Sequence, residues 1–143
     1  MSDFTLILDE TPDPESRKAI LAPLRKYSAN WIGEPVVQPL AIFIRDPKTD
    51  EIVGGLWGHS AAGWLFVDLL FVPESLRRRG IGTRLLRDAE NAAIKRGDIG
   101  VWLSTGNFQA PGFYERMGYA RFGTHPDYPR GYETGYYARR LTV

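Results

Sequence analysis

The chain contains no cysteine among its 143 residues. This excludes disulfide bonds, thiolate metal sites and a covalent cysteine nucleophile. An excess of one charge sign is also lacking, because 18 basic and 17 acidic residues leave a formal net charge of +1. Such a balance gives no reason to expect a nucleic-acid or membrane partner.

Long hydrophobic runs are absent as well. No apolar run approaches the ~18 residues that a membrane-spanning helix needs, and the start of the chain lacks the basic-then-apolar pattern of a signal peptide. The two histidines, His59 and His125, have no acids at metal-ligand spacing, so no metal is expected. We therefore expect one domain over residues 1–143, in the cytoplasm, with a single hydrophobic core.

Hydrophobic periodicity and turn residues divide the chain into alternating strands and helices. Helices are predicted to begin at Asp13-Pro14-Glu15, where Pro23 should later kink or split the helix, and at Ile81. The full set of predicted elements is strand 4–8, helix 13–31, strands 40–44, 51–57 and 64–72, helix 81–96, strand 99–103, helix 110–117, and strands 119–122 and 136–141. This order, β-α-β-β-β-α-β-α-β-β, predicts a mixed α/β domain around one central sheet.

The segment Arg77-Arg78-Arg79-Gly80-Ile81-Gly82 lies between a predicted strand and a predicted helix. Glycines let the backbone approach an oxyanion closely, and the first amides of a helix point at such an anion with the helix dipole behind them. The segment therefore suggests a site for a diphosphate-bearing cofactor. The alternative is a solvated basic turn that the glycines merely make tight.

Two common nucleotide-binding loops do not fit this segment. A dinucleotide fingerprint needs a third glycine, and the third position after Gly82 is Leu85. A Walker loop needs Gly-Lys-Ser/Thr, which the sequence does not contain.

Three segments together resemble the GCN5-related N-acetyltransferase (GNAT) superfamily, in particular its small bacterial members. They are residues 66–73, residues 77–82, which match the family's Gln/Arg-x-x-Gly-x-Gly/Ala loop, and residues 107–119. The resemblance covers about Leu40 to Leu141. It implies a single, mostly antiparallel mixed sheet with splayed central strands flanked by helices. It also implies acetyl-CoA as co-substrate.

The resemblance also implies which residues hold the donor. The backbone of the strand end would hold pantetheine, the glycine loop would hold the pyrophosphate, and Arg77 or Arg79 would bind that pyrophosphate or the adenosine 3′-phosphate. Asn107 would bind the pantetheine arm, or would serve only as a helix cap or turn residue. The implied cofactor-binding residues are Leu70, Phe71, Val72, Arg77, Arg78, Arg79, Gly80, Ile81, Gly82, Thr83, Asn107 and Tyr114.

Asp68 and Tyr114 are the candidate catalytic residues. Asp68 interrupts an apolar strand, and a carboxylate beside an amine can take its proton; the alternative is an arginine-paired or solvent-facing carboxylate. In the family, a tyrosine at the position of Tyr114 protonates the departing coenzyme A thiolate. The alternative is a tyrosine packed in the core with its hydroxyl bonded.

The resemblance implies an N-acetyltransferase that moves the acetyl group of acetyl-CoA to a primary amine by direct attack. A small-molecule amine is favoured over a protein lysine, because the chain is small and has no extra recognition domain. The alternative is a non-catalytic acyl-CoA-binding sensor on the same fold. Residues 127–133 would line the acceptor pocket or form a plain surface loop. Dimers are common in the family, so a homodimer is also expected, with Trp31 and Trp64 as candidate contacts.

Overall fold

The computed structural model describes residues 3–110 and 112–141. The chain divides between Pro35 and Val36 into two compact units, an N-terminal one and a C-terminal one. The expectation of one domain over residues 1–143 stays a prediction.

The described residues of the N-terminal unit, 3–35, contain one helical segment. A single 3₁₀ turn, η1 (Pro14–Ser16), leads into helix α1 (Arg17–Ile32). The side chain of Asp13 accepts a hydrogen bond from the amide of Glu15 at 3.0 Å, and Pro14 occupies the first helical position. The predicted helix start is thus confirmed. Of the kink or split predicted at Pro23, the split is wrong, because α1 continues through this residue, and the kink stays a prediction.

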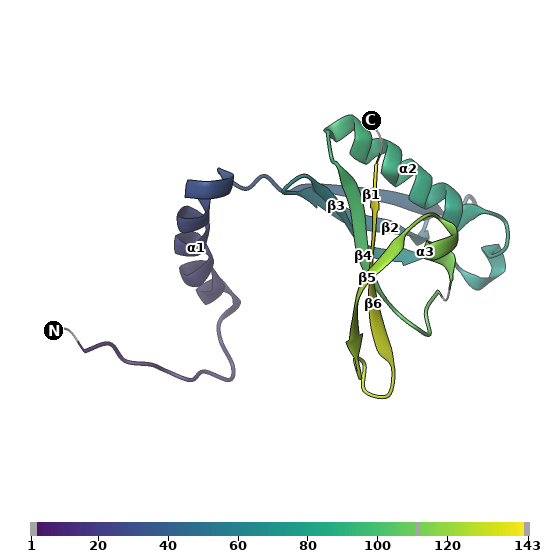
Figure 1. Cartoon of the computed structure of the whole chain (residues 1–143). Coiled ribbons are helices and arrows are strands. Elements are labelled where there is room, and N and C mark those ends of the chain that lie inside the picture. Colours follow the sequence, from purple (N-terminus) through teal and green to yellow (C-terminus); the bar gives the residue numbers. More distant parts are fainter. Residues whose placement is uncertain (1–2, 111, 142–143) are drawn as a thin grey trace. The chain divides into compact units, whose positions relative to one another are not determined.

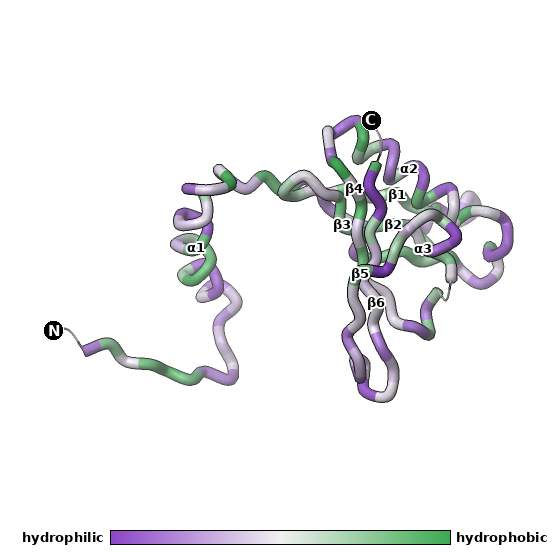
Figure 2. The backbone as a smooth tube through the Cα atoms, in the orientation of Figure 1, coloured by the Kyte–Doolittle hydropathy of each residue, from purple (hydrophilic) through white to green (hydrophobic). Residues whose placement is uncertain are grey.

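The strand predicted at residues 4–8 is wrong. The structure has no strand there, and the apolar side chains of this stretch are exposed, with Leu6 98% exposed. Figure 2 shows the stretch as a hydrophobic part of the tube. A strand requires backbone partners in a neighbouring strand. The described part of the N-terminal unit contains no strand that could supply them.

The C-terminal unit is built on one six-stranded sheet (Figure 1). The strand order is β1-β2-β3-β4-β6-β5; the β3–β4 pair is parallel and every other pair is antiparallel. The mixed, mostly antiparallel sheet is therefore confirmed. Its elements are β1 (Gln38–Arg45), β2 (Ile52–Ala61), β3 (Trp64–Phe71), η2 (Glu74–Leu76), α2 (Ile81–Arg96), β4 (Gly100–Gly106), α3 (Phe113–Arg116), β5 (Ala120–Pro126) and β6 (Glu133–Arg140).

Within this unit the predicted elements form, with shifted ends. Helix α2 has the predicted bounds, set by Gly80 and Gly97, whose φ angles are 75° and 87°. Strand β4 extends beyond its predicted end because β6 pairs with it as far as Gly106. Helix α3 begins at Phe113, later than predicted; Pro111, expected in its first turn, lies outside the described residues.

The core lies between α2 and one face of the sheet. Buried apolar side chains of α2, among them Leu86 and Ala89, join buried side chains of the central strands, among them Leu65 and Val101. The parallel pairing of β3 and β4 ends at Val67 and Leu103, although both strands continue. The predicted splaying of the central strands is thus confirmed.

A buried carboxylate ties α2 to the sheet. Glu90 is 3% exposed. It accepts a hydrogen bond from the hydroxyl of Tyr119 at 2.6 Å and forms ion pairs with Arg87 at 2.7 Å and Arg139 at 2.8 Å. Because a buried carboxylate is costly unless it is paired, these contacts fix the position of α2 over the sheet.

Candidate active site

The junction between β3 and α2 leaves the start of α2 open. Gly80 is the N-cap, and no side chain caps the helix. The first amides of a helix have no carbonyl partner within the helix, so they can bind an anion. A Cβ atom added at Gly82 would lie 3.5 Å from the Phe113 ring. A small side chain would therefore fit at Gly82 in ordinary van der Waals contact with that ring.

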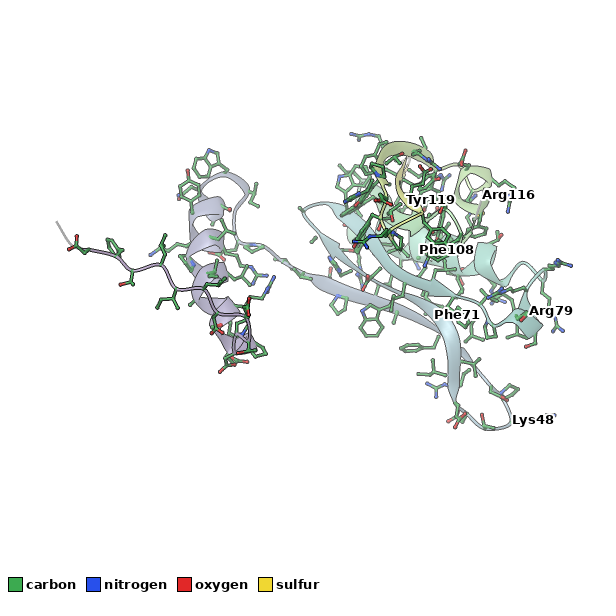
Figure 3. All side chains as sticks on the ribbon, turned by 90° about the horizontal axis from the view of Figure 1, so that it is seen from below. Lys48, Phe71, Arg79, Phe108, Arg116 and Tyr119 are labelled. Atoms are coloured by element: carbon green, nitrogen blue, oxygen red, sulfur yellow. The ribbon has the colours of Figure 1, made fainter. Side chains whose placement is uncertain are left out.

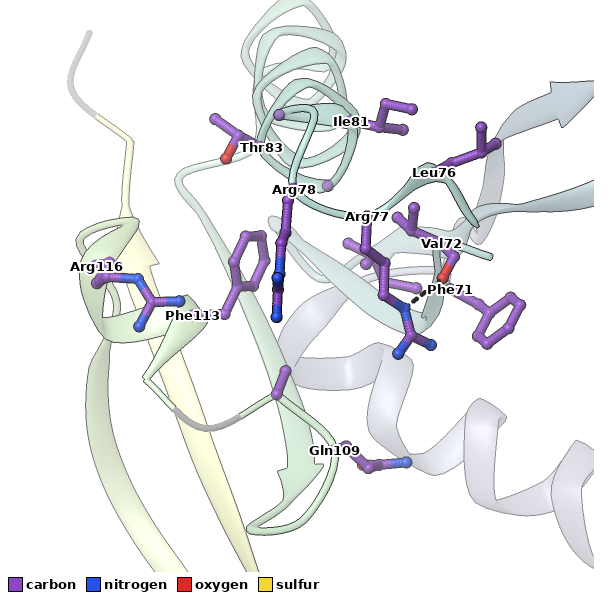
Figure 4. Close-up of a pocket in the computed structure, with 14 residues that line it drawn as sticks. Phe71, Val72, Leu76, Arg77, Arg78, Ile81, Thr83, Gln109, Phe113 and Arg116 are labelled. Carbon is purple, nitrogen blue, oxygen red and sulfur yellow. Dashed lines mark hydrogen bonds between the residues drawn. The ribbon is translucent and has the colours of Figure 1, made fainter. Parts of the chain in front are cut away.

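A cavity of about 680 Å³ lies against this helix start. Figure 4 shows its residues, which come from the end of β3, the loop before α2, the start of α2 and the segment around α3. The described lining includes three arginines and no carboxylate, so the cavity suits an anion. Its lining residues are Leu70, Phe71, Val72, Leu76, Arg77, Arg78, Gly80, Ile81, Gly82, Thr83, Gln109, Ala110, Phe113 and Arg116.

The structure separates the three consecutive arginines. The Nε atom of Arg77 donates to the Val72 carbonyl at 2.9 Å, drawn as a dashed line in Figure 4. Arg78 has a φ angle of 65° and extends into the cavity beside Phe113. Arg79 does not line the cavity, and Figure 3 shows it at the outer edge of the loop. The side chain of Arg78, not that of Arg79, thus reaches the cavity.

Sequence reasoning missed several lining residues. Phe113 and Arg116 were not proposed as binding residues, although their spacing of three places them on one face of a short helix. Gln109 also lines the cavity, and its Oε1 atom accepts from the Gly106 amide at 2.8 Å. No local motif marks Leu76 or Ala110 as lining residues.

Tyr114 lies in the core beneath this site. It is 7% exposed and its ring packs near Phe113, Tyr119 and Tyr137. Burial raises the pKa of Tyr114 to about 12. None of the side-chain hydrogen bonds among residues 3–110 and 112–141 involves its hydroxyl, whereas the Tyr119 hydroxyl is held by Glu90. Tyr114 is absent from the described cavity lining.

Asp68 lies at an irregularity of β3. Trp57 of β2 pairs with Leu69 and Gly58 pairs with Val67, so Asp68 is the extra residue of a β-bulge. Its side chain is exposed. Within the described part of the chain, Asp68 takes part in no ion pair. Of the two alternatives to a catalytic role, the structure contains the solvent-facing carboxylate and not the arginine-paired one.

Asn107 lies outside the large cavity and fastens a loop. Its amide donates to the Glu133 carbonyl at 2.9 Å, and its Oδ1 atom accepts from the Glu133 amide at 3.4 Å. It lines a second cavity of about 180 Å³ together with Arg121 and Tyr137. In the nearby segment 127–133, the ring of Tyr132 lies 5.0 Å from that of Phe108.

The described residues contain neither a metal-binding cluster nor a membrane-spanning helix. No group of three or more His, Cys, Asp or Glu residues is arranged to hold a metal ion in that part of the chain. None of the helices found there is long and apolar enough to cross a membrane.

The split sheet and the arginine-lined cavity at the start of α2 define a mixed α/β fold with an anion site of the kind that the sequence resemblance implies. The model of the family described as "Acetyltransferase (GNAT) family" matches residues 5–119. The chain therefore belongs to this family, and it is an acetyltransferase enzyme.

Known relatives agree with this assignment. The chain is 43% identical over 121 residues to Acetyltransferase Atu2258 of Agrobacterium fabrum, covering 85% of this chain and 88% of the relative. It is 45% identical over 125 residues to Blasticidin-S acetyltransferase of Streptomyces morookaense, covering 87% and 78%. A crystal structure of a candidate acetyltransferase from Agrobacterium tumefaciens aligns with a TM-score of 0.88 at 38% identity, covering 96% and 100%.

Proposed function

We propose that this protein moves the acetyl group of acetyl-CoA to the nitrogen of a primary amine, by direct attack of the amine within a ternary complex. The observation that carries the proposal is the cavity beside the split in the sheet, where three arginines meet the open start of α2. When bound, acetyl-CoA supplies an activated acetyl thioester. The absence of cysteine from the chain favours direct transfer over a cysteine acyl-enzyme.

The residues around the cavity fit a diphosphate group. We assign the pyrophosphate to the backbone amides from Arg78 to Thr83 and to the Arg78 guanidinium. Arg79, at the outer edge of the loop, is suited to the 3′-phosphate. The backbone of Leu70, Phe71 and Val72 is assigned to pantetheine, and Arg77 supports this strand end through its bond to Val72. Asn107 is assigned to the pantetheine arm of coenzyme A. It would act by holding its own loop to Glu133 through two hydrogen bonds.

Two side chains are assigned to the chemical step, one to deprotonate the acceptor amine and one to stabilise the departing sulfur. Alkylamines have a pKa near ~10.4, so only about one molecule in two thousand is neutral at pH 7. Asp68, exposed and without an ion-pair partner among the described residues, takes the proton of the acceptor amine directly or through water. Tyr114, with its pKa raised to about 12 by burial, stays protonated and donates a hydrogen bond to the departing sulfur. The second proton, which the nitrogen loses once it is acylated, passes through water to the departing thiolate, so coenzyme A leaves as the thiol.

The acceptor is proposed to be a small molecule. One relative is named for acetylation of blasticidin S and is 45% identical over most of this chain, which supports a small-molecule amine over a protein lysine. The N-terminal unit and residues 127–133 carry no motif that narrows the acceptor further.

The test is thiol release from acetyl-CoA by the full chain across a panel of amines, including blasticidin S, polyamines, aminoglycosides, amino acids and lysine peptides. We expect turnover with at least one small-molecule amine, and an acetylated nitrogen by mass spectrometry. Binding of coenzyme A in calorimetry without turnover on any acceptor would favour the sensor alternative. No binding of coenzyme A at all would refute the assigned donor site.

We also propose a homodimer. Taken by itself, the N-terminal unit buries none of its described residues, and the large side chains of Ile20, Tyr27 and Trp31 on α1 need another surface to cover them. Apolar surface of this extent marks an interaction site. Light scattering after size exclusion should give twice the chain's mass of 16.1 kDa. A monomeric mass at micromolar concentration would refute the dimer.

A further inference from the structure

The face of the sheet that does not contact α2 carries a row of aromatic rings. Leu65 and Val67 of β3 are buried in the core with α2, and side chains alternate between the faces of a strand. Phe66 therefore points to the opposite face. Its ring lies 4.5 Å from that of Trp102 on β4 and 5.6 Å from that of His59 on β2. We call His59, Phe66 and Trp102 the aromatic row.

The aromatic row ends where the sheet splits. Phe66 pairs with Trp102 in the parallel β3–β4 ladder, and the last pair, Val67 with Leu103, follows directly. One residue further, β3 carries Asp68 and β4 carries Ser104, both exposed. The rings thus lie at the mouth of the split, and the two exposed polar side chains follow on its two edges.

The carboxylate of Asp68 gives this surface a charge that suits an ammonium group. Flat rings beside it offer a stacking surface and negative ring faces that attract cations. Asp68 follows Phe66 by two residues, a span of roughly 6–7 Å along a strand. Leu70, which lines the donor cavity, follows Asp68 by two residues on the same strand. Because the bulge at Asp68 interrupts the alternation, Leu70 packs on the α2 side while Asp68 follows the aromatic row. A molecule held at Asp68 is therefore within two residues, along the strand, of the segment that lines the donor cavity.

We propose that this surface is the acceptor site and that it selects a primary amine tethered to a planar aromatic or heteroaromatic ring. The ring of the acceptor stacks on Phe66 and Trp102, and its ammonium group pairs with Asp68. This inference rests on the proposed acetyl transfer and names the class of its acceptor. Trp102 and Phe66 are specificity residues in it, whereas the donor-binding residues are unaffected.

The test compares two amines that differ only in the ring, 2-phenylethylamine and its saturated counterpart 2-cyclohexylethylamine. Steady-state kinetics with acetyl-CoA are measured for the wild type, Trp102→Leu, Phe66→Leu and the control Phe43→Leu. Phe43 is also an exposed aromatic residue of the sheet, 48% exposed, but it lies on β1, two strands from β3. Calorimetry measures binding of both amines to each variant with coenzyme A present.

We expect the aromatic amine to have the lower KM in the wild type. Trp102→Leu and Phe66→Leu should each raise that KM roughly three- to tenfold, the range of an aromatic contact, with the KM for acetyl-CoA and the KM for the saturated amine unchanged. Phe43→Leu should match the wild type. Equal KM values for the two amines in the wild type, or equal losses for both amines in Trp102→Leu, would overturn the inference.

Calorimetry separates this inference from the proposed function. If the wild type binds 2-phenylethylamine, weakened by Trp102→Leu, but acetylates neither amine, the surface is an amine site and the proposed transfer to this class of amine is wrong. If blasticidin S or another amine is acetylated but 2-phenylethylamine neither binds nor reacts, the transfer stands and the inference is overturned. If Trp102→Leu or Phe66→Leu unfolds, seen as a lost thermal transition, the other of these two variants carries the test.

Discussion

Tyr114 and Tyr119 together test the assignment of the Tyr114 hydroxyl to the departing sulfur, because substitution of the one should affect turnover and substitution of the other should affect stability. Both tyrosines are buried in the same core, 7% and 3% exposed, with ring centroids 6.0 Å apart. Only the Tyr119 hydroxyl has a partner among the described residues, the Glu90 carboxylate at 2.6 Å. Removing each hydroxyl by substitution with phenylalanine should therefore affect two different properties.

For Tyr114→Phe we expect a loss of turnover with little loss of stability. A hydrogen bond to a charged group is worth about 1.5–3 kcal/mol. Removing such a bond to the departing sulfur should lower kcat by about 10- to 150-fold, since about 1.36 kcal/mol corresponds to a tenfold change. The free energy of unfolding should change by less than about 1 kcal/mol, because the side-chain hydrogen bonds among the described residues do not involve the Tyr114 hydroxyl.

For Tyr119→Phe we expect the reverse. Loss of the bond to buried Glu90 should lower the free energy of unfolding by about 1.5–3 kcal/mol, which lowers Tm by roughly 3–12 °C for a chain of this size. The kcat of the folded enzyme should stay within about twofold of the wild type, because that hydroxyl is already bonded within the fold.

Thiol release at saturating acetyl-CoA and amine gives kcat, and urea unfolding followed by circular dichroism gives stability. Substrate saturation matters because it separates a catalytic defect from weaker binding. Full turnover in Tyr114→Phe would refute the assignment of this hydroxyl to the departing sulfur. An equal loss of turnover in both variants would mean that the effect arises from disturbed packing.

Three further outcomes are expected. Gly80→Ala and Gly97→Ala should each lose about 1–2 kcal/mol of stability, because both positions have positive φ and open space around an added Cβ; calorimetry should detect weaker coenzyme A binding only in Gly80→Ala. Glu90→Gln should lower stability by about 1–3 kcal/mol in urea unfolding, since Arg87 and Arg139 lose their charged partner but stay partly exposed to solvent; no measurable loss contradicts the structural role. The pKa of Tyr114 is higher in the folded than in the unfolded chain, so its contribution is complete below about pH 10 and is lost as pH rises through about 12. Alkaline unfolding should thus be less steep in Tyr114→Phe.

The sequence alone was sufficient for features that depend on local interactions. The bounds of α2 follow from two glycines at its ends and from its apolar periodicity. The hairpin of β1 and β2 follows from two apolar runs around a turn. The strand at residues 4–8 was predicted from the same kind of local signal and did not form, because a strand also depends on a partner elsewhere in the chain.

Only the tertiary structure decided how the site is arranged. The sequence motif does not tell which of the three consecutive arginines reach the cavity, and in the structure Arg77 and Arg78 line it. Phe113 and Arg116 join that cavity because α3 is brought against the start of α2 by the pairing of β4 with β3. The aromatic row and the bulge at Asp68 likewise depend on strand register. Register is a property of paired strands, so residues far apart in the sequence determine it together.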